Sequence, residues 1–394
     1  MQKLFQDAKK LQTDLIEYRR ALHERAEVGF EIPKTKEFLE NTLKEIGCDF
    51  RDCGRAGIQV TLGKGKKCVL LRADCDGLPI QEKTGFPYAS KKGNMHACGH
   101  DMHTAMLLGA ILLLKARERE LPCKVKCLFQ PAEEILEGAK DCIKTGILKG
   151  VSSAVSLHVM TDVALPSGTV VIPSGGVGAP AADYFKVKVY GKSCHGSAPQ
   201  NGVDAVGVLC QILFALQEIT AREIPVSDCS VLTVGKIEGG TAGNVIAAYA
   251  EGEGTLRSFD EETRAFIKKR IEEISAYIAK AFRAKAKVEF YGGCPTLVND
   301  QGLSAHMYEC AKKHFNADMV LSSDELGGGT SKKSGGSEDF AYFSHEVPSV
   351  LLALSAGETE KGYEYPLHHP KVCFDESVLY IGSGLYALFA LSSK

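Results

Sequence analysis

The distribution of apolar residues along the chain predicts two kinds of folded region. Up to about residue 180, short apolar runs (residues 69–71, 125–129 and 155–157) alternate with helical patterns. Apolar runs separated by helices are typical of a mostly parallel sheet that is covered on both faces. The sequence therefore predicts an α/β domain in this part of the chain.

A different pattern begins near residue 181. The segment YFKVKVYGK alternates apolar and polar residues, as a strand with one buried face does. A helix at 203–220, strands at 230–239 and 244–257, a helix at 261–284 and a strand at 287–291 complete the order β-α-β-β-α-β of a ferredoxin-like domain. We therefore expect an α/β domain of residues 1–180 and 294–394, with a second domain inserted at 181–293.

Polar residues follow the three apolar runs of the first region. Asp74 and Asp76 follow the first run, Glu133 and Glu134 the second, and His158 the third. In parallel sheets, sites lie outside the carboxyl ends of the strands. A glutamate pair is more commonly an exposed acidic face, and a lone histidine is commonly a core residue. Their positions after buried strands favour a functional site instead.

The segment MHACGHDMHTA contains Cys98, His100 and His103 within six residues. Thiolate, imidazole and carboxylate groups hold borderline divalent metals. A helix predicted to begin near Asp101 would place its positive end beside Cys98 and favour the thiolate. Cys98 as a nucleophile with His100 as its base is the rival interpretation. The pair of glutamates favours metal-assisted hydrolysis, because one can ligate while the other moves protons.

Three later histidines are weaker candidates. His195 begins a loop after a strand of the inserted domain, in KSCHGSAPQ. His368 and His369 form a pair in PLHHPK, and one of them could complete a metal shell. One of the two aspartates, Asp74 or Asp76, could orient a histidine from behind the site.

Composition narrows the choice of partners and compartment. The net charge is −2 and no basic cluster occurs, which argues against nucleic acid and acidic membranes as partners. The longest apolar run, residues 105–114, is half of the ~20 residues that span a bilayer, so we expect no membrane span. The charged N-terminus is unlike a signal peptide, and the fourteen cysteines are then expected to be thiols in a reducing cytoplasm.

Several long motifs occur in the order found in a known family: RRALHERAEVGFE, LRADCDGLPIQE, GNMHACGHDMHTAMLLGA, LFQPAEE, GKSCHGSAPQNGVDAV, EGGTAGNVI, GSEDFAYF and LHHP. The chain resembles the M20 metallopeptidases, specifically the amidohydrolase branch of hippurate, N-acyl amino acid and auxin-conjugate hydrolases. The resemblance runs nearly end to end. It implies a zinc-peptidase-like catalytic domain with an inserted ferredoxin-like α+β lid and dimerisation domain.

The resemblance also assigns roles to individual residues. Cys98 resembles the ligand shared by two metal ions, and the remaining ligands would be His100, Glu134, His158 and His368. Glu133 resembles the general base that activates water and then protonates the leaving amine. In the inserted domain, His195 would stabilise the oxyanion, often across a dimer interface, and Asn244 and Arg257 would bind substrate, Arg257 being suited to a carboxylate. Asp76 would support the ligands from behind.

The activity implied is metal-dependent hydrolysis of the amide bond of N-acyl amino acids or similar small conjugates, by a homodimer in the cytoplasm. The two metal ions would be Mn or Zn, with Co or Ni as further options, because a Cys/His/Glu site accepts several. Two alternatives stay open: a dipeptidase or aminoacylase of different acyl preference, and a non-catalytic metal-dependent binding protein on the same fold.

Overall fold

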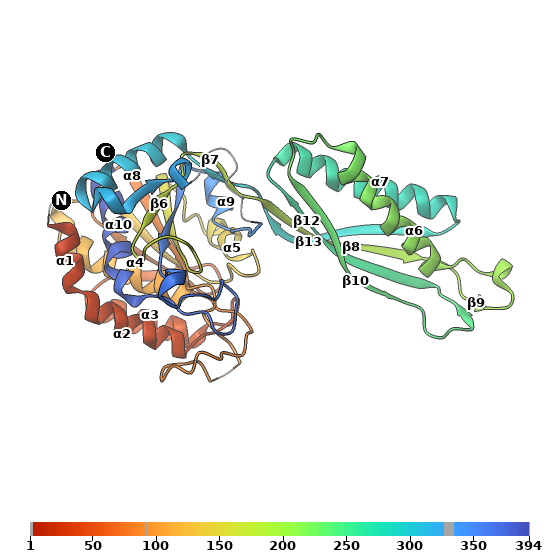
Figure 1. Cartoon of the computed structure of the whole chain (residues 1–394), viewed down its shortest axis with the longest axis horizontal. Coiled ribbons are helices and arrows are strands. Elements are labelled where there is room, and N and C mark those ends of the chain that lie inside the picture. Colours follow the sequence, from red (N-terminus) through yellow and green to blue (C-terminus); the bar gives the residue numbers. More distant parts are fainter. Residues whose placement is uncertain (1–2, 92, 327–334, 394) are drawn as a thin grey trace. The chain divides into compact units, whose positions relative to one another are not determined.

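The structure, a computed structural model, describes residues 3–91, 93–326 and 335–393, and it divides into two compact units (Figure 1). The second unit comprises Ala179–Leu297 and a short segment that ends at Glu338, and the first unit comprises the rest. The predicted inserted domain, residues 181–293, lies within the second unit.

The first unit is built on an eight-stranded sheet with the order β1-β2-β4-β3-β5-β16-β6-β15. Its four neighbouring strands β4, β3, β5 and β16 are parallel, whereas β2 and β6 run antiparallel to their inner neighbours. The predicted mostly parallel α/β sheet is thus confirmed. The strands are β1 (Phe50–Cys53), β2 (Gly57–Leu62), β3 (Cys68–Asp74), β4 (Lys124–Gln130), β5 (Val151–Met160), β6 (Val170–Ile172), β15 (Val320–Ser322) and β16 (Ser349–Ser355).

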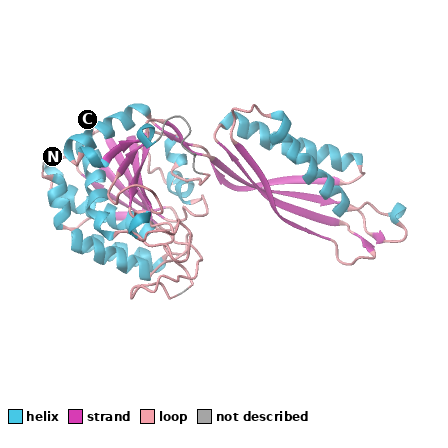
Figure 2. Ribbon diagram, in the orientation of Figure 1, coloured by secondary structure: helices cyan, strands magenta, loops and turns pink. Residues whose placement is uncertain are grey.

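Helices cover both faces of this sheet (Figure 2). Helices α4 and α10 pack on each other and on β3 and β5, while α5 and α9 pack on β4 and β16. All seven residues of β3 are buried, as a doubly covered strand requires. The helices are α1 (Leu4–Lys10), α2 (Gln12–Glu24), α3 (Pro33–Ile46), α4 (His100–Lys115), α5 (Gly138–Lys144), α8 (Gln301–His314), α9 (Ala341–Ser344) and α10 (Leu379–Ser392).

The short elements of the first unit connect these layers. A two-stranded sheet pairs β7 (Gly176–Ala179) with β14 (Leu297–Asn299), where the chain passes between the two units. Single turns of 3-10 helix lie in the connections at Glu118–Glu120, Ala317–Met319, Ser323–Leu326, Thr359–Lys361 and Glu376–Val378.

The second unit has the predicted β-α-β-β-α-β order. Its antiparallel sheet has the order β10-β12-β8-β13, and the apolar faces of α6 and α7 form a core with it. Asp204 and Asp260 cap these helices by accepting bonds from Val206 N and Thr263 N. The elements are β8 (Ala181–Tyr190), β9 (Cys194–His195), α6 (Ala205–Glu218), β10 (Ser230–Gly239), β11 (Val245–Ile246), β12 (Tyr249–Ser258), α7 (Glu261–Ala281) and β13 (Lys285–Cys294), with a 3-10 turn at Pro199–Asn201 and a π-helical turn at Ile219–Glu223.

One strand prediction is corrected. The single strand expected at 244–257 is two strands, β11 and β12. The carbonyls between them, on Ala247 and Ala248, accept bonds from Ala205 N and Gly191 N instead of continuing a ladder. Strand β11 pairs with β9 in a separate two-stranded sheet.

Helix α6 and the following π-helical turn, Ala205–Glu223, are long and apolar enough to cross a membrane by length and composition alone. Core helices of water-soluble domains meet the same criterion. Here Leu209, Ile212 and Leu216 of this helix are buried against the four-stranded sheet. The longest apolar run in the sequence, residues 105–114, lies outside this segment.

Candidate metal centre

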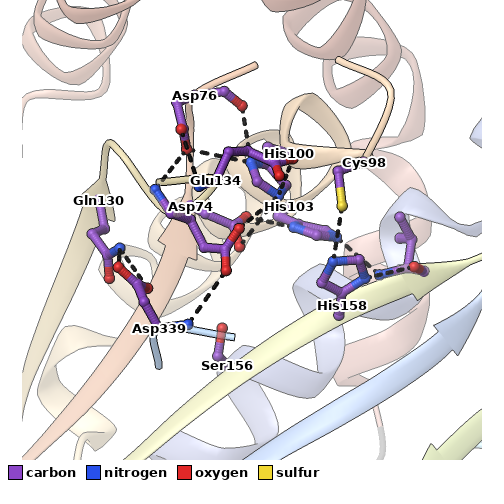
Figure 3. Close-up of polar contacts among 12 residues, drawn as sticks. Asp74, Asp76, Cys98, His100, His103, Gln130, Glu134, Ser156, His158 and Asp339 are labelled. Atoms are coloured by element: carbon purple, nitrogen blue, oxygen red, sulfur yellow. Dashed lines mark hydrogen bonds and ion pairs between the residues drawn. The ribbon is translucent and has the colours of Figure 1, made fainter. Parts of the chain in front are cut away.

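Histidine, cysteine and carboxylate side chains converge where β3, β4 and β5 end, in the first unit (Figure 3). Among the described residues, five groups of side chains have donor atoms within 4.8 Å of one another. Three of them contain the predicted ligands: Cys98, His100 and His158; Cys98, Glu134 and His368; and His100, Glu133 and Glu134. The other two are Asp74, His100 and His103, and Glu133, Glu338 and Asp339. Cys98, His100 and Glu134 each belong to two of the groups that contain predicted ligands. These groups therefore form one continuous cluster of donors, as a pair of adjacent metal ions requires.

The donor atoms are spaced as coordination to a metal requires, and the contacts of Glu134 with the histidines are too long for hydrogen bonds. The Sγ of Cys98 lies 3.5 Å from His158 Nε2 and 3.3 Å from His368 Nε2. Glu134 places one oxygen 3.6 Å from His368 Nε2 and the other 3.8 Å from His100 Nε2. Metal–ligand bonds of about 2.0–2.3 Å at tetrahedral angles separate donor atoms by roughly 3.3–3.7 Å. Nitrogen–oxygen hydrogen bonds are shorter, about 2.7–3.2 Å.

The tautomers of two histidines are fixed by their other ring nitrogens. His100 Nδ1 donates to the Asp76 carbonyl at 2.9 Å, and His158 Nδ1 donates to the Val159 carbonyl at 2.7 Å. In the neutral form of each ring, the unprotonated nitrogen is therefore Nε2, which faces the centre. Such hydrogen bonds orient metal-ligating histidines.

Two buried atoms of the site, His100 Nε2 and Glu134 Oε1, have no hydrogen-bond partner. Leaving buried polar atoms unsatisfied is costly, and a divalent ion would satisfy both. The residues present therefore fit a metal. The site opens to solvent at His368, whose side chain is 52% exposed, so a small substrate can reach it.

The electrostatics of the site correct one sequence argument. Helix α4 begins at His100, close to its predicted start, but burial raises the pKa of the Cys98 thiol far above its usual range, and His100 lowers it only in part. The expectation that the helix end alone favours the thiolate is therefore wrong, because desolvation outweighs it. The same burial disfavours Cys98 as a free nucleophile. Ligation by a metal is what would hold the thiolate.

The pKa values of the other donors are also shifted. Burial raises the pKa of Glu134 to about 7, against the opposing effect of His100. Burial, with His103 adding to it, lowers the pKa of His158 to about 3. Burial lowers the pKa of His100 as well, but Asp74, the Asp76 contact and Cys98 outweigh it, and the net pKa lies well above the usual range.

Asp76 lies directly behind the ligands, where its carboxylate accepts bonds from Glu133 N at 3.1 Å and Glu134 N at 3.4 Å. Its carbonyl accepts the His100 bond described above. Asp76 thus fixes the backbone of Glu133 and Glu134 and the imidazole ring of His100.

The backbone around the site is under local constraint. Gly99, between Cys98 and His100, has φ +83°, and a Cβ there would come within 2.4 Å of Val159 Cγ2. Ala132 and His368 have positive φ angles, 59° and 66°, which cost energy in residues other than glycine. The sequence alone does not reveal these angles.

Asp74 and His103 form a support that the sequence only hinted at. His103 Nδ1 donates to Asp74 Oδ1 at 2.5 Å, and its Nε2 accepts from Val159 N at 2.9 Å. The His103 ring contacts the His158 ring with centroids 4.6 Å apart. Both ring nitrogens already have hydrogen-bond partners. His103 therefore lines the site and does not offer it a metal ligand.

Arg72 and Asp339 are not among the predicted site residues, and both side chains are buried. Arg72 lies two residues before Asp74, and Asp339 lies in GSEDFAYF, a motif to which no role was given. The signal that could have found them is a charged residue inside a buried strand and an acid next to the aromatic Phe340, since such charges need partners.

The remaining predicted site residues lie in the second unit. His195 on β9 pairs with Val245 on β11, and Gly196 N donates to the Asn244 carbonyl at 2.7 Å. His195 and Asn244 are therefore neighbours, and both are exposed. His195 Nδ1 accepts from Ser197 N at 3.1 Å, which places the proton of the neutral ring on Nε2, as an oxyanion donor needs.

Arg257 lies elsewhere in the second unit. It is on β12, opposite Ala182 at the beginning of β8, and its guanidinium lies 5.7 Å from the centre of the Tyr184 ring. His195 follows the other end of β8. The structure thus does not bring Arg257 together with His195 and Asn244 within the unit.

Comparison with known proteins decides the family. Residues 70–392 match peptidase family M20/M25/M40. The chain belongs to this family. A solved M20 structure, a dinuclear metal binding peptidase from Bacillus subtilis, is 30% identical, with a TM-score of 0.79 over 97% of this chain and 98% of that one.

Relatives place this M20 protein in the amidohydrolase branch, as the sequence predicted. The N-acetyl-L-cysteine deacetylase of Bacillus subtilis (strain 168) is 38% identical over 94% of this chain and 85% of its own length. An IAA-amino acid hydrolase of Arabidopsis thaliana is 34% identical over 95% of this chain and 84% of its own. The M20 protein is accordingly a hydrolase of amide bonds that uses divalent metal, and the prediction of a metalloenzyme is confirmed.

Proposed function

We propose that this M20 protein hydrolyses the amide bond of N-acyl amino acids or similar small conjugates with two divalent ions held by Cys98, His100, Glu134, His158 and His368. The observation that carries the proposal is the convergence of these donors on Cys98, at distances that suit coordination. The names of the deacetylase and amino acid hydrolase relatives support the substrate class.

The metals would be Mn²⁺ or Zn²⁺, with Co²⁺ or Ni²⁺ as further options, since softness and geometry of this donor set admit all four. When bound, they supply Lewis acidity, which polarises the scissile carbonyl and makes water a better nucleophile. A mixed thiolate, imidazole and carboxylate set does not suit Mg²⁺ or Ca²⁺, which prefer oxygen ligands.

In this proposal Glu133 is the general base. Its carboxylate places Oε2 3.9 Å from His100 Nε2, at the edge of the donor cluster, while Glu134 beside it ligates. Glu133 takes the proton from the attacking water and returns it to the amine nitrogen as the amide bond breaks. His195 would donate a hydrogen bond from Nε2 to the tetrahedral oxyanion. Asn244 and Arg257 would hold the substrate, and the Arg257 guanidinium would bind the substrate's carboxylate.

Glu133→Gln tests this assignment. Turnover should fall by roughly 10²–10⁴, the usual contribution of a general base, with metal content unchanged, because the substitution keeps shape and leaves the donors in place. Metal content is measured by elemental analysis and turnover on an N-acetyl amino acid. Near-normal turnover would remove Glu133 from the mechanism.

The cysteine-nucleophile alternative is tested with a chelator, which should inactivate the protein reversibly only if metal is essential.

We further propose that the protein acts as a homodimer through the second unit. Arg257 lies opposite Ala182 at the beginning of β8, whereas His195 lies on β9, beyond the other end of β8. The segment from Ala182 to Tyr190 alone spans roughly 25 Å of strand. A small substrate cannot touch both. If both serve catalysis, each site takes one of them from a partner copy of the chain.

An apolar surface supports this dimer. Strand β10 is an edge of its sheet, and Val231 and Ile237 on it are 56% and 59% exposed. Phe214 on the neighbouring helix α6 is 83% exposed. A long edge strand with exposed apolar side chains is prone to pair with a second chain. The cytoplasm is the compartment we propose, because fourteen free cysteines, nine of them buried, suit a reducing environment.

A further inference from the structure

A buried carboxylate lies directly behind the proposed base. Asp339 is fully buried, and its backbone N donates to Glu133 Oε1 at 3.3 Å. Its side chain accepts from Arg72 Nη2 at 2.8 Å, from Gln130 Nε2 at 2.8 and 2.9 Å to its two oxygens, and from Ala139 N at 2.8 Å. Figure 3 shows the Gln130 amide facing the Asp339 carboxylate.

Arg72 and Gln130 also bond to each other, and Arg72 connects the Asp339 carboxylate to Asp74. The guanidinium of Arg72 donates from Nη1 to Asp74 Oδ2 at 2.8 Å and from Nε to the Gln130 side-chain oxygen at 3.0 Å. We call Arg72, Asp74, Gln130 and Asp339 the Asp339 network. Its charged members, one arginine and two aspartates, are all buried, and Asp74 connects it to His103.

A buried charge network of this kind is not the cheapest way to hold a fold together. Desolvation of the ions offsets much of their attraction, and well-packed apolar residues often do as well or better. The network instead fixes the orientation of the Asp339 backbone N–H. Strands β3 and β4 supply Arg72 and Gln130, these and Ala139 N fix the Asp339 carboxylate, and the backbone N–H of Asp339 is thereby aimed at Glu133.

The consequence for Glu133 is a fixed rotamer. With Oε1 tied to Asp339 N, the other oxygen, Oε2, is the one that faces the donor cluster, 3.9 Å from His100 Nε2. A general base must lie within hydrogen-bond reach of the proton it takes, and a displacement of about 1 Å can cost roughly 100-fold in rate. Catalysis by Glu133 therefore depends on the group that holds Oε1, the oxygen that does not take the proton.

We propose that Asp339 is a positioning residue for Glu133, and that Arg72 and Gln130 act by fixing Asp339. The inference rests on the proposed role of Glu133 as base. It predicts that a change in the network reduces the chemical step without removing the metal ligands or the substrate-binding residues.

The test uses an exchange of carboxylate and amide within the network of the full-length metal-loaded enzyme. Asp339→Asn should lower kcat roughly 10–100-fold with KM and metal content unchanged, the loss typical of a partner that orients a site residue. Gln130→Glu alone should also lower kcat, because two carboxylates then face each other. The double variant Gln130→Glu/Asp339→Asn restores one carboxylate and one amide to Arg72 and should regain most of kcat.

The matched control is Asp141→Asn on the same helix α5 that Asp339 contacts through Ala139. The Asp141 carboxylate accepts from Arg55 N at 2.6 Å, outside the network, so kcat should stay at the wild-type value. Thermal unfolding of each variant measures any loss of stability. If Asp339→Asn does not fold, Gln130→Met replaces it, since this change removes the amide but keeps the Arg72–Asp339 pair, and should still lower kcat severalfold.

Wild-type kcat in Asp339→Asn, or in Gln130→Met where that replaces it, would overturn the inference. So would a loss of kcat that follows loss of metal, or a double variant no more active than the singles. Failure of the proposed function is a separate result, because Glu133→Gln would then retain turnover whatever the Asp339 variants do.

Discussion

At the scale of single residues, the site depends on His103, a histidine whose two ring nitrogens are both used in hydrogen bonds and are not available to a metal. The His103 ring lies edge-to-face against His158, with centroids 4.6 Å apart, and 5.4 Å from the His100 ring. Its own nitrogens are used by Asp74 and by Val159 N. His103 therefore holds both neighbouring rings in the orientation that ligation needs.

His103→Gln should weaken metal binding roughly 10–100-fold, the usual cost of losing a partner that orients metal ligands. The glutamine can keep at most one of the two hydrogen bonds and cannot replace the ring. Titration of metal-stripped protein against a chromogenic chelator measures the affinity. His306→Gln on α8, far along the chain from these donors, is the control. Equal affinity in both variants would contradict the role given to His103.

Metal binding should depend on pH through Glu134. Its pKa is raised to about 7, so below pH 7 it carries a proton that a metal must displace. The apparent affinity should therefore rise from pH 5 to 8 as Glu134 loses its proton, and it should go on rising above pH 8 because the raised pKa values of Cys98 and His100 keep these two ligands protonated there. His158, with its pKa lowered to about 3, stays neutral throughout. Calorimetry in buffers of different ionisation enthalpy counts the protons released. An affinity that is flat between pH 5 and 8 would contradict this assignment.

Which residues the sequence could identify follows from how they act. Cys98, His100 and Glu134 act through side chains in dense local motifs, so residue type and spacing were enough to propose them. Asp339 contributes a backbone N–H to a residue 206 positions away, and no side-chain pattern records that. The positive φ of His368 likewise follows from three-dimensional closure of a loop and not from its neighbours in the chain.

At the scale of elements, the turn after β4 is the most constrained part of the site. Gln130, Pro131 and Ala132 lead into Glu133, and Ala132 has φ 59°. The beginning of α5 packs so closely on this turn that a Cβ on Gly138 would lie 1.7 Å from the Pro131 carbonyl oxygen. The orientation of Glu133 and Glu134 thus depends on a glycine in the next helix.

Gly138→Ala should therefore inactivate the enzyme and lower its stability by about 1–3 kcal/mol, the usual cost of overpacking. The clash is with backbone, which can give way only by moving the turn. Gly302→Ala in α8, where the nearest atom would be an ordinary 3.4 Å away, is the control. Turnover and chemical denaturation are measured on both. A fully active Gly138→Ala enzyme would mean that the turn tolerates displacement.

The order of elements was predictable because the burial of one or both faces of an element produces a periodic pattern of apolar residues in the sequence. Strand β3 was visible as an apolar run, and the alternation in β8 marked a sheet with one covered face. The break between β11 and β12 was not predictable, since it depends on carbonyls of Ala247 and Ala248 that bond to distant segments. Element type follows local pattern, whereas element ends follow tertiary hydrogen bonds.

At the scale of the whole molecule, the second unit carries two proposed substrate contacts that one site cannot share from one chain. Arg257 lies on β12 beside the beginning of β8, whereas His195 lies on β9, which follows the other end of β8. In the proposed dimer, this separation would make the partner copy part of the mechanism and not only of the assembly.

Mixing two inactive variants tests that arrangement. Glu133→Gln and His195→Ala should each be nearly inactive alone. In a mixed dimer whose sites take His195 from the partner, one site has both residues intact, so statistical exchange should recover roughly a quarter of wild-type activity. The mixture is made by refolding or slow exchange and assayed against each parent. No recovery, with mixed dimers present, would place His195 in the site of its own chain.

The central claim is that amide hydrolysis here requires the metals held around Cys98. The most direct measurement strips the protein with a chelator and assays a panel of hippurate, N-acetyl amino acids, N-acetyldiaminopimelate and simple dipeptides before and after Mn²⁺ or Zn²⁺ is added back. We predict activity on an N-acyl amino acid only after metal is restored. Full activity in the stripped protein, or silence across the panel with two metals bound, would contradict the account.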